Sequence, residues 1–209
     1  MMTNRLVQFG NVPITSAMAA SAFPELKAKA SKVSELEKSG EIIRLKKGLY
    51  AVSPEISGQP LSTELIANHL YAPSYISRHS ALRFYGLIPE SVYTIQSMTV
   101  KHSRSFETSV GRYEYFSLSR EVFPIGLCTK NIEGASFIIA TPEKALCDLI
   151  ANAPAVNLRY IKEAEEYLAD DLRLDMDALF EMNTDILRAY AQVGKKAQSI
   201  NTVIKLIER

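Results

Sequence analysis

Residues 40–50 read Gly-Glu-Ile-Ile-Arg-Leu-Lys-Lys-Gly-Leu-Tyr, and this stretch decides the fold of the N-terminal part of the chain. Apolar residues on both sides of the Lys47-Gly48 pair predict a strand, a tight turn and a second strand between positions 41 and 52. Gly40 stands where a preceding helix would end, because glycine accepts the left-handed conformation common at helix C-termini. The stretch therefore predicts a β-hairpin that follows a helix.

Cations alternate with apolar residues in the first predicted strand, where Ile43 and Leu45 alternate with Arg44 and Lys46. Because successive side chains of a strand point to opposite faces, the apolar pair is predicted to pack while the cations face outward. Together with Lys47 at the tip, these cations predict a wing that contacts DNA phosphates or a minor groove.

Two helices are predicted upstream of this hairpin. Thr15 is a suitable N-cap for a short alanine-rich helix that reaches Ala22. Pro24 suits the first position of a second helix running to about Ser39, because its missing N–H would have no partner there in any case. Helix, turn, helix and hairpin is the order of a winged helix, which we expect over residues 1–56.

The second of these helices is the predicted recognition helix. Its apolar face on a helical wheel comprises Leu26, Ala30, Val33 and Leu36. A helix with lysines and serines on the opposite face can enter a major groove. The candidate DNA-binding residues of the helix and wing are Lys27, Ser31, Lys32, Arg44, Lys46 and Lys47.

A linker is predicted at Ser53–Pro60, because two prolines, a glycine and two serines within eight residues disfavour both helix and strand. The remainder, residues 57–209, is predicted to be a mixed α/β domain with a helical tail from about residue 155. Its apolar periodic segments suffice for a core of its own. The predicted elements are helices from Ser62 to Leu70 and from Ser77 to Gly86, strands Val92–Val100, Gly111–Leu118 and Ser136–Ala140, and a helix starting at Thr141. The expected fold class is thus α+β.

Charge is distributed unevenly although the net charge is only +1. Residues 1–50 hold eight Lys/Arg against four Asp/Glu, whereas residues 159–185 hold three against nine. A basic N-terminal part indicates a nucleic-acid partner. The loop that begins Lys101-His102-Ser103-Arg104, with Arg112 after it, forms a possible second basic patch comprising Lys101, Arg104 and Arg112.

No catalytic, cofactor or metal motif is found along the sequence. Three histidines and two cysteines offer no zinc spacing, and neither a phosphate-binding glycine loop nor a nucleophile motif occurs. The stretch Thr141-Pro142-Glu143-Lys144 favours a structural helix start, so we expect no enzyme and no cofactor. Cys128 and Cys147 are expected to stay reduced. Without a signal segment or a run of about 20 apolar residues, a cytoplasmic location is expected.

Three stretches of the sequence resemble the AbiEi-type antitoxins of type IV toxin–antitoxin and abortive-infection systems. They are the hairpin at 40–50, then Tyr75-Ile76-Ser77 with Ser80-Ala81-Leu82 and Tyr85-Gly86-Leu87-Ile88-Pro89-Glu90, and Ala140-Thr141-Pro142-Glu143-Lys144-Ala145-Leu146-Cys147-Asp148-Leu149. Together with the intervening strands, the resemblance spans about residues 28–150.

This resemblance implies a transcriptional regulator whose N-terminal winged helix binds inverted repeats of double-stranded DNA in its own promoter. It also implies a C-terminal antitoxin domain that counteracts a nucleotidyltransferase-like toxin without necessarily touching it. Two alternatives remain open. One is a nuclease-like enzyme with a winged-helix targeting domain, although Glu143 directly beside Lys144 does not match the nuclease spacing. The other is a protein-binding adaptor.

Overall fold

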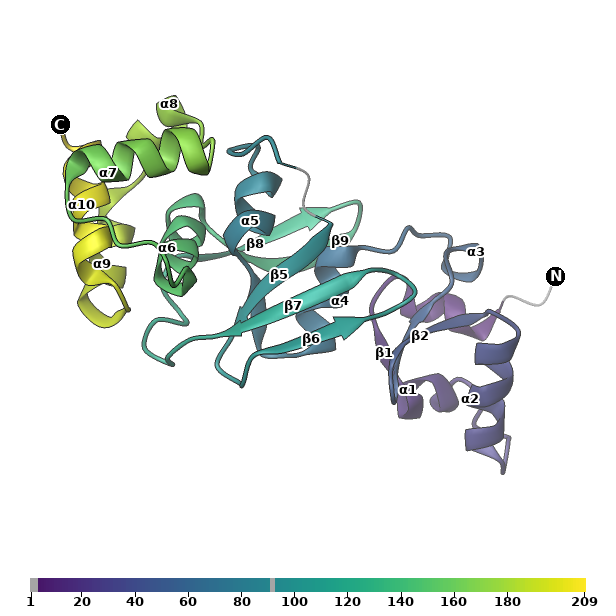
Figure 1. The fold of residues 1–209 in the computed structure, drawn as a ribbon. Coiled ribbons are helices and arrows are strands. Elements are labelled where there is room, and N and C mark those ends of the chain that lie inside the picture. Colours follow the sequence, from purple (N-terminus) through teal and green to yellow (C-terminus); the bar gives the residue numbers. More distant parts are fainter. Residues whose placement is uncertain (1–3, 91–92) are drawn as a thin grey trace.

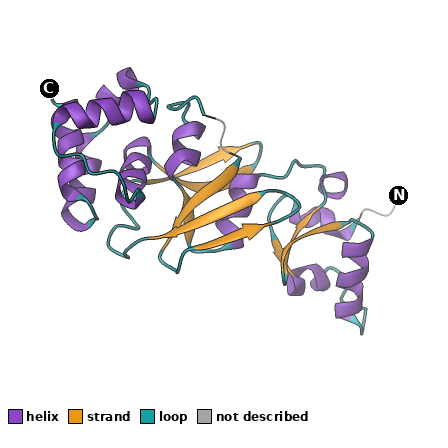
Figure 2. Ribbon diagram, in the orientation of Figure 1, coloured by secondary structure: helices purple, strands orange, loops and turns teal. Residues whose placement is uncertain are grey.

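The computed structural model describes residues 4–90 and 93–209 of an α+β protein. Three parts follow one another along the molecule (Figure 1). A small N-terminal unit of helices and strands, the head, occupies one end, and a six-stranded sheet with flanking helices lies in the middle. Helices alone form the C-terminal end (Figure 2).

The head contains a 3-10 helix, two α-helices and a three-stranded antiparallel sheet of order β1-β3-β2. Its elements are η1 Arg5–Phe9, β1 Ile14–Thr15, α1 Ser16–Ser21, α2 Lys29–Lys38, β2 Ile42–Lys46 and β3 Leu49–Val52. Thr15 caps α1 through its hydroxyl, which accepts from the Met18 N–H, as its place before the alanine-rich run predicts.

The second helix begins later than predicted, at Lys29 instead of Pro24. Pro24 instead follows Phe23 in a turn that the Leu26 N–H closes onto the Phe23 carbonyl, a position that proline also favours. Of the predicted apolar face, Val33 and Leu36 are buried, whereas Leu26 and Ala30 are exposed. Leu26 lies outside the helix, so the wheel does not apply to it.

The hairpin is confirmed, with an irregularity that changes which residues it buries. The register shifts between Arg44 and Lys46, so two steps along β2 oppose one step along β3. Ile42 is buried and Ile43 only half-buried, whereas Leu45 is buried as predicted. A bulge of this kind interrupts simple alternation, and it explains why Lys46 is half-buried while Arg44 is exposed.

The predicted linker contains a short helix, α3 Pro54–Ser57. Ser53 caps it by accepting from the Glu55 N–H, Pro54 occupies its first position, and Gly58 ends it with a φ of 68°. The same residues that discourage long elements thus make a single helical turn. Gln59 then accepts a hydrogen bond from the Asn11 N–H, which ties this segment to the head.

The middle part is built on a mixed sheet of order β6-β7-β5-β4-β9-β8. The pairs β4–β9 and β5–β7 are parallel, and the other neighbours are antiparallel. The elements are α4 Thr63–Leu70, β4 Ser74–Ile76, α5 Arg78–Phe84, β5 Thr94–Thr99, β6 Arg104–Glu107, β7 Arg112–Ser117, β8 Leu127–Ile132, β9 Ala135–Ala140 and α6 Pro142–Asn152.

Most predicted elements of the middle part are found, but three strands are additional. β5 begins at Thr94, and Val92 of the predicted strand lies outside the described residues. The segment at 101–106, predicted as a loop, enters the edge strand β6, because Arg104 pairs with Tyr115 of β7. Strands β4 and β8 were likewise not predicted, since their short or polar sequences lack the usual apolar alternation.

The C-terminal helices follow as α7 Ile161–Glu166, η2 Tyr167–Asp171, α8 Met176–Phe180, α9 Thr184–Val193 and α10 Ala197–Ile207. They share one large apolar core with the middle part, and a smaller core lies within the head. Both Cys128 and Cys147 are free thiols. Among the described residues, no helix has the length and apolar character needed to span a membrane.

The hairpin of the head contributes to both cores. Ile42, Tyr50 and Val52 belong to the small core of the head. Leu45, Leu49 and Ala51 belong to the large core. Opposite faces of one hairpin therefore join the head to the rest of the chain, consistent with the position of β2 between α2 and the large sheet (Figure 1).

Candidate nucleic-acid interface

An open groove of about 570 Å³ lies on the head between α1, α2 and the hairpin. Three cations line it, namely Lys29 and the hairpin residues Arg44 and Lys47. The rest of its lining is mostly small, comprising Ser16, Ala17, Ala20, Ala30, Val33, Ser34, Gly48 and Tyr50. Small side chains leave room for a ligand backbone between the cations.

The hairpin turn is held against α1 at one side of this groove. The Ser16 N–H donates to the Gly48 carbonyl at 3.1 Å. Gly48 has a φ of 80°, a left-handed conformation that favours glycine. The turn therefore presents Lys47 from a fixed backbone.

The DNA-binding residues predicted on the second helix differ in whether their side chains are free to contact a ligand. Lys27 is exposed but precedes α2, and Ser31 is exposed on the first turn of the helix. Lys32 is engaged, because its ammonium pairs with Glu35 at 2.8 Å and lies 5.2 Å from the centre of the Phe23 ring. Of these three residues, Lys27 and Ser31 are the ones open to a ligand.

The cations of the hairpin also differ. Lys47 is exposed, and Arg44 is half-exposed with its guanidinium 3.5 Å from the Glu37 carboxylate. Lys46 instead faces the middle part of the chain, where its ammonium donates to the Leu70 carbonyl. The predicted wing cations thus divide, with Arg44 on the groove, Lys46 at the junction of the head with the sheet, and Lys47 bordering both.

The second predicted patch lies at that junction as well. Lys101, between β5 and β6, and Arg104, the first residue of β6, line the same small pocket as Lys46. Arg112 stands apart, pairing with Glu107 at 3.0 Å on the surface of the β6–β7 ribbon. The structure therefore brings part of the wing and part of the second patch together.

Lys29 and Ser34 are groove residues that the sequence did not single out as DNA-binding positions. Lys29 was overlooked because the helix was expected to begin five residues earlier, which made Lys27 the first cation of its outer face. The sequence does contain a signal for Lys29, because this residue precedes buried Val33 by one helical turn and therefore borders the packed face of the helix.

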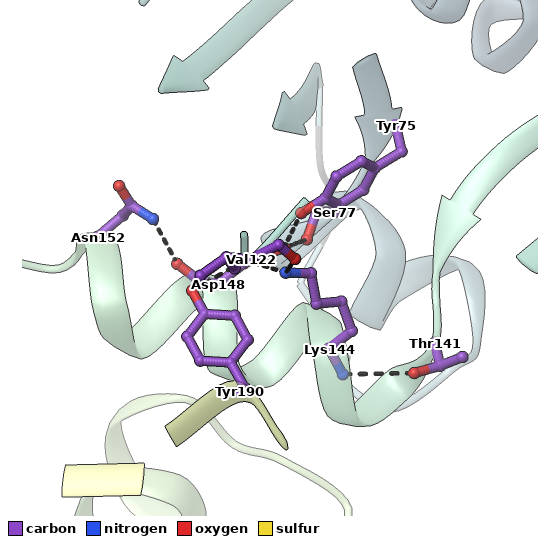
Figure 3. Close-up of polar contacts among 8 residues, drawn as sticks. All are labelled: Tyr75, Ser77, Val122, Thr141, Lys144, Asp148, Asn152 and Tyr190. Carbon is purple, nitrogen blue, oxygen red and sulfur yellow. Dashed lines mark hydrogen bonds and ion pairs between the residues drawn. The ribbon is translucent and has the colours of Figure 1, made fainter. Parts of the chain in front are cut away.

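A polar cluster lies in the large core and links α6 to β4 and α9 (Figure 3). Lys144 and Asp148, one turn apart on α6, form an ion pair of 3.2 Å with both side chains fully buried. The Asp148 carboxylate also accepts hydrogen bonds from Tyr75 at 2.9 Å, Ser77 at 2.8 Å and Tyr190 at 3.0 Å. Every group at the carboxylate is therefore a donor.

Burial governs the ionisation of this cluster. It raises the pKa of Asp148, whereas the nearby Lys144 ammonium and the hydroxyl donors lower it. Burial likewise lowers the pKa of Lys144, against the attraction of Asp148. Burial also raises the pKa of the Tyr75 and Tyr190 hydroxyls, so both stay protonated donors. The cluster has a structural role, tying a sheet strand to two helices.

The described part of the structure offers no candidate metal site. Within residues 4–90 and 93–209, no group of three or more His, Cys, Asp or Glu side chains is placed to hold a metal ion. The groove of the head and the pocket at the junction are the two surface hollows lined by several cations that are described above.

No protein-family model and no curated protein matches this chain. Among solved structures, the crystal structure of the RV2827C protein from Mycobacterium tuberculosis is similar, with a TM-score of 0.50 and 13% sequence identity. The similarity covers 96% of this chain and 78% of that one. At this identity the likeness concerns the fold, which the two proteins share over nearly the whole of this chain.

Proposed function

We propose that this chain is a DNA-binding transcriptional regulator and that its head is a winged helix. The order of the elements supports this proposal, because η1, β1, α1, α2, β2 and β3 follow one another with a sheet of order β1-β3-β2. In such a head α2 is the recognition helix and the β2–β3 turn is the wing.

The observation that carries the proposal is the groove between α2 and the hairpin. Lys29, Arg44 and Lys47 line it from two separate elements, so their charges converge on one space. Neutralisation of backbone phosphates by lysine and arginine supplies most of the affinity of non-specific DNA binding. Ser31 and Ser34 lie exposed on the same helix and are the proposed contacts to base edges.

The triple variant Lys29→Ala, Arg44→Ala, Lys47→Ala tests this assignment. It is expected to weaken binding to all duplexes similarly, because phosphate contacts carry no sequence information. In gel shifts with the DNA upstream of its own gene, the dependence of log affinity on log salt concentration should flatten by about one unit per lost contact.

The matched control is Lys162→Ala, which removes an exposed cation from the C-terminal helix α7. Its affinity and salt dependence should equal those of the wild-type protein. An unchanged salt dependence in the triple variant would exclude the groove as the DNA contact. Failure of the wild-type protein to bind its upstream DNA would contradict the regulator proposal as a whole.

The antitoxin part of the proposal rests on the resemblance of the sequence to AbiEi-type antitoxins. We expect that cells arrested by a nucleotidyltransferase-like toxin encoded beside this chain resume growth when this chain is co-expressed with the toxin. The triple groove variant should restore growth equally, because the head is assigned to DNA and the remainder to the toxin's effect. Growth counts against an empty vector measure the rescue, and absence of rescue by the wild-type chain would contradict the antitoxin role alone.

A further inference from the structure

A pocket of about 400 Å³ lies where the head meets the large sheet. The hairpin supplies Lys46 and Lys47 to it, and the end of α4 and the entrance to β6 supply the rest. Its complete lining is Lys46, Lys47, His69, Tyr71, Ala72, Lys101, Arg104 and Phe106. The pocket thus joins residues from both sides of the junction.

The lining is strongly positive and contains no carboxylate among the described residues. None of Lys46, Lys101 and Arg104 forms an ion pair within the described part of the chain, unlike Arg112 on the neighbouring ribbon. Burial together with the charges of Lys101 and Arg104 lowers the pKa of Lys46. An anion in the pocket would relieve this mutual repulsion.

Backbone carbonyls and aromatic rings hold the cations in place. The Lys46 ammonium donates to the Leu70 carbonyl, and the Lys101 ammonium donates to the Ala72 carbonyl. The Lys101 ammonium lies 5.0 Å from the centre of the Tyr71 ring, and the Arg104 guanidinium lies 4.9 Å from that of Phe106. An ammonium has three donors, so each lysine keeps donors for a ligand. The charges are therefore positioned in advance.

We propose that this pocket binds a phosphate group. Four cationic side chains suit a multiply charged anion better than a single carboxylate, and arginine can donate two parallel hydrogen bonds to phosphate oxygens. The phosphate belongs either to a free nucleotide or to a DNA backbone. If the phosphate belongs to a DNA backbone, the inference rests on the proposed DNA binding. If it belongs to a free nucleotide, the inference depends on the pocket alone.

Thermal unfolding in the presence of phosphate tests the pocket directly, because a ligand that binds the folded state raises its midpoint temperature. The probes are inorganic phosphate and adenosine 5′-monophosphate, each compared with sodium chloride at equal ionic strength. We compare the wild-type protein with Lys101→Gln/Arg104→Gln, which removes both charges but keeps polar side chains, and with Arg112→Gln as the matched cation outside the pocket.

A free ligand would raise the midpoint of the wild-type and Arg112→Gln proteins but not that of the double variant. A backbone phosphate would instead leave these midpoints unchanged, while the double variant binds a duplex at least tenfold more weakly than Arg112→Gln does, with a flatter salt dependence. Either result supports the pocket. Equal responses of the double variant and Arg112→Gln to phosphate, nucleotide and duplex would overturn it.

The two proposals fail separately in these experiments. Lys47 lines both the groove and the pocket, so the variant that separates them is Lys29→Ala, Arg44→Ala, which changes groove residues alone. If duplex affinity is insensitive to this groove variant, the groove assignment is wrong, whatever phosphate does to the midpoint. If the Arg112→Gln protein and the double variant respond alike to every probe, the pocket assignment is wrong, whatever the groove variant does. Lys101→Ala alone serves as a second pocket variant should the double variant fail to show a cooperative unfolding transition.

Discussion

Replacement of Asp148 by alanine is expected to lower the free energy of unfolding by about 3–5 kcal/mol. The change would leave the fully buried Lys144 ammonium with the Val122 carbonyl, 3.0 Å away, as its remaining polar partner. It would also remove the acceptor of the Tyr75, Ser77 and Tyr190 hydroxyls. A buried charge and three buried donors without partners are each costly.

Urea unfolding followed by circular dichroism measures this effect. The control is Glu166→Ala, which removes the acid of another ion pair one helical turn apart, in this case with Lys162 at 3.6 Å. That pair is exposed, with 85% and 58% of the two side chains accessible, so its loss should change stability by about 0.5 kcal/mol or less. Similar changes in the two variants would show that the buried cluster is not structural.

Removal of residues 1–56 is expected to destabilise the remainder severely. Leu45, Leu49 and Ala51 of the hairpin belong to the large apolar core that also contains Ile66 and Leu70 of α4. Their loss would expose apolar side chains of that core to water. We expect the cost in free energy of this exposure to outweigh the stabilisation that the apolar residues of the remainder provide by themselves. Circular dichroism of the fragment 57–209 should show no unfolding transition at the midpoint of the full chain. A fragment with the same midpoint would mean that the remainder folds independently of the hairpin.

A pair of single substitutions isolates the same contact in the full chain. Leu45→Ala is expected to lower the free energy of unfolding by about 2–5 kcal/mol, because Leu45 is 4% exposed in the large core. Leu26→Ala, at a head residue that is 38% exposed, should cost about 0.5 kcal/mol or less. The division of the chain at residue 56 remains a prediction, but these experiments decide whether the two sides fold separately.

Local chemistry made several elements predictable from the sequence alone. Thr141 caps α6 and Pro142 occupies its first position, as their order along the chain indicates. Ser62 caps α4 in the same manner, through its hydroxyl and the Leu65 N–H. The Lys47-Gly48 turn likewise follows from two adjacent residues. Each of these features depends on groups within a few positions of one another, so a linear pattern contains the information.

Elsewhere a residue stands at a position typical of its type but has a different role in the structure. Ser77 stands at the N-cap position of α5, yet its hydroxyl donates to Asp148 and makes no cap hydrogen bond. Pro24 stands before a helix but serves a turn. In both cases two local arrangements suit the residue, and its surroundings decide between them.

The sequence by itself determined an α+β chain with a basic N-terminal hairpin, a helical C-terminal part and helix starts at capping residues. Only the tertiary structure decided that the bulge in β2 turns Lys46 away from Arg44 and toward Lys101 and Arg104. It also decided that β6 forms at all, since an edge strand of polar sequence depends on its pairing with β7. The physical reason is common to both. Contacts between segments distant along the chain depend on register and packing, which no short stretch of residues specifies.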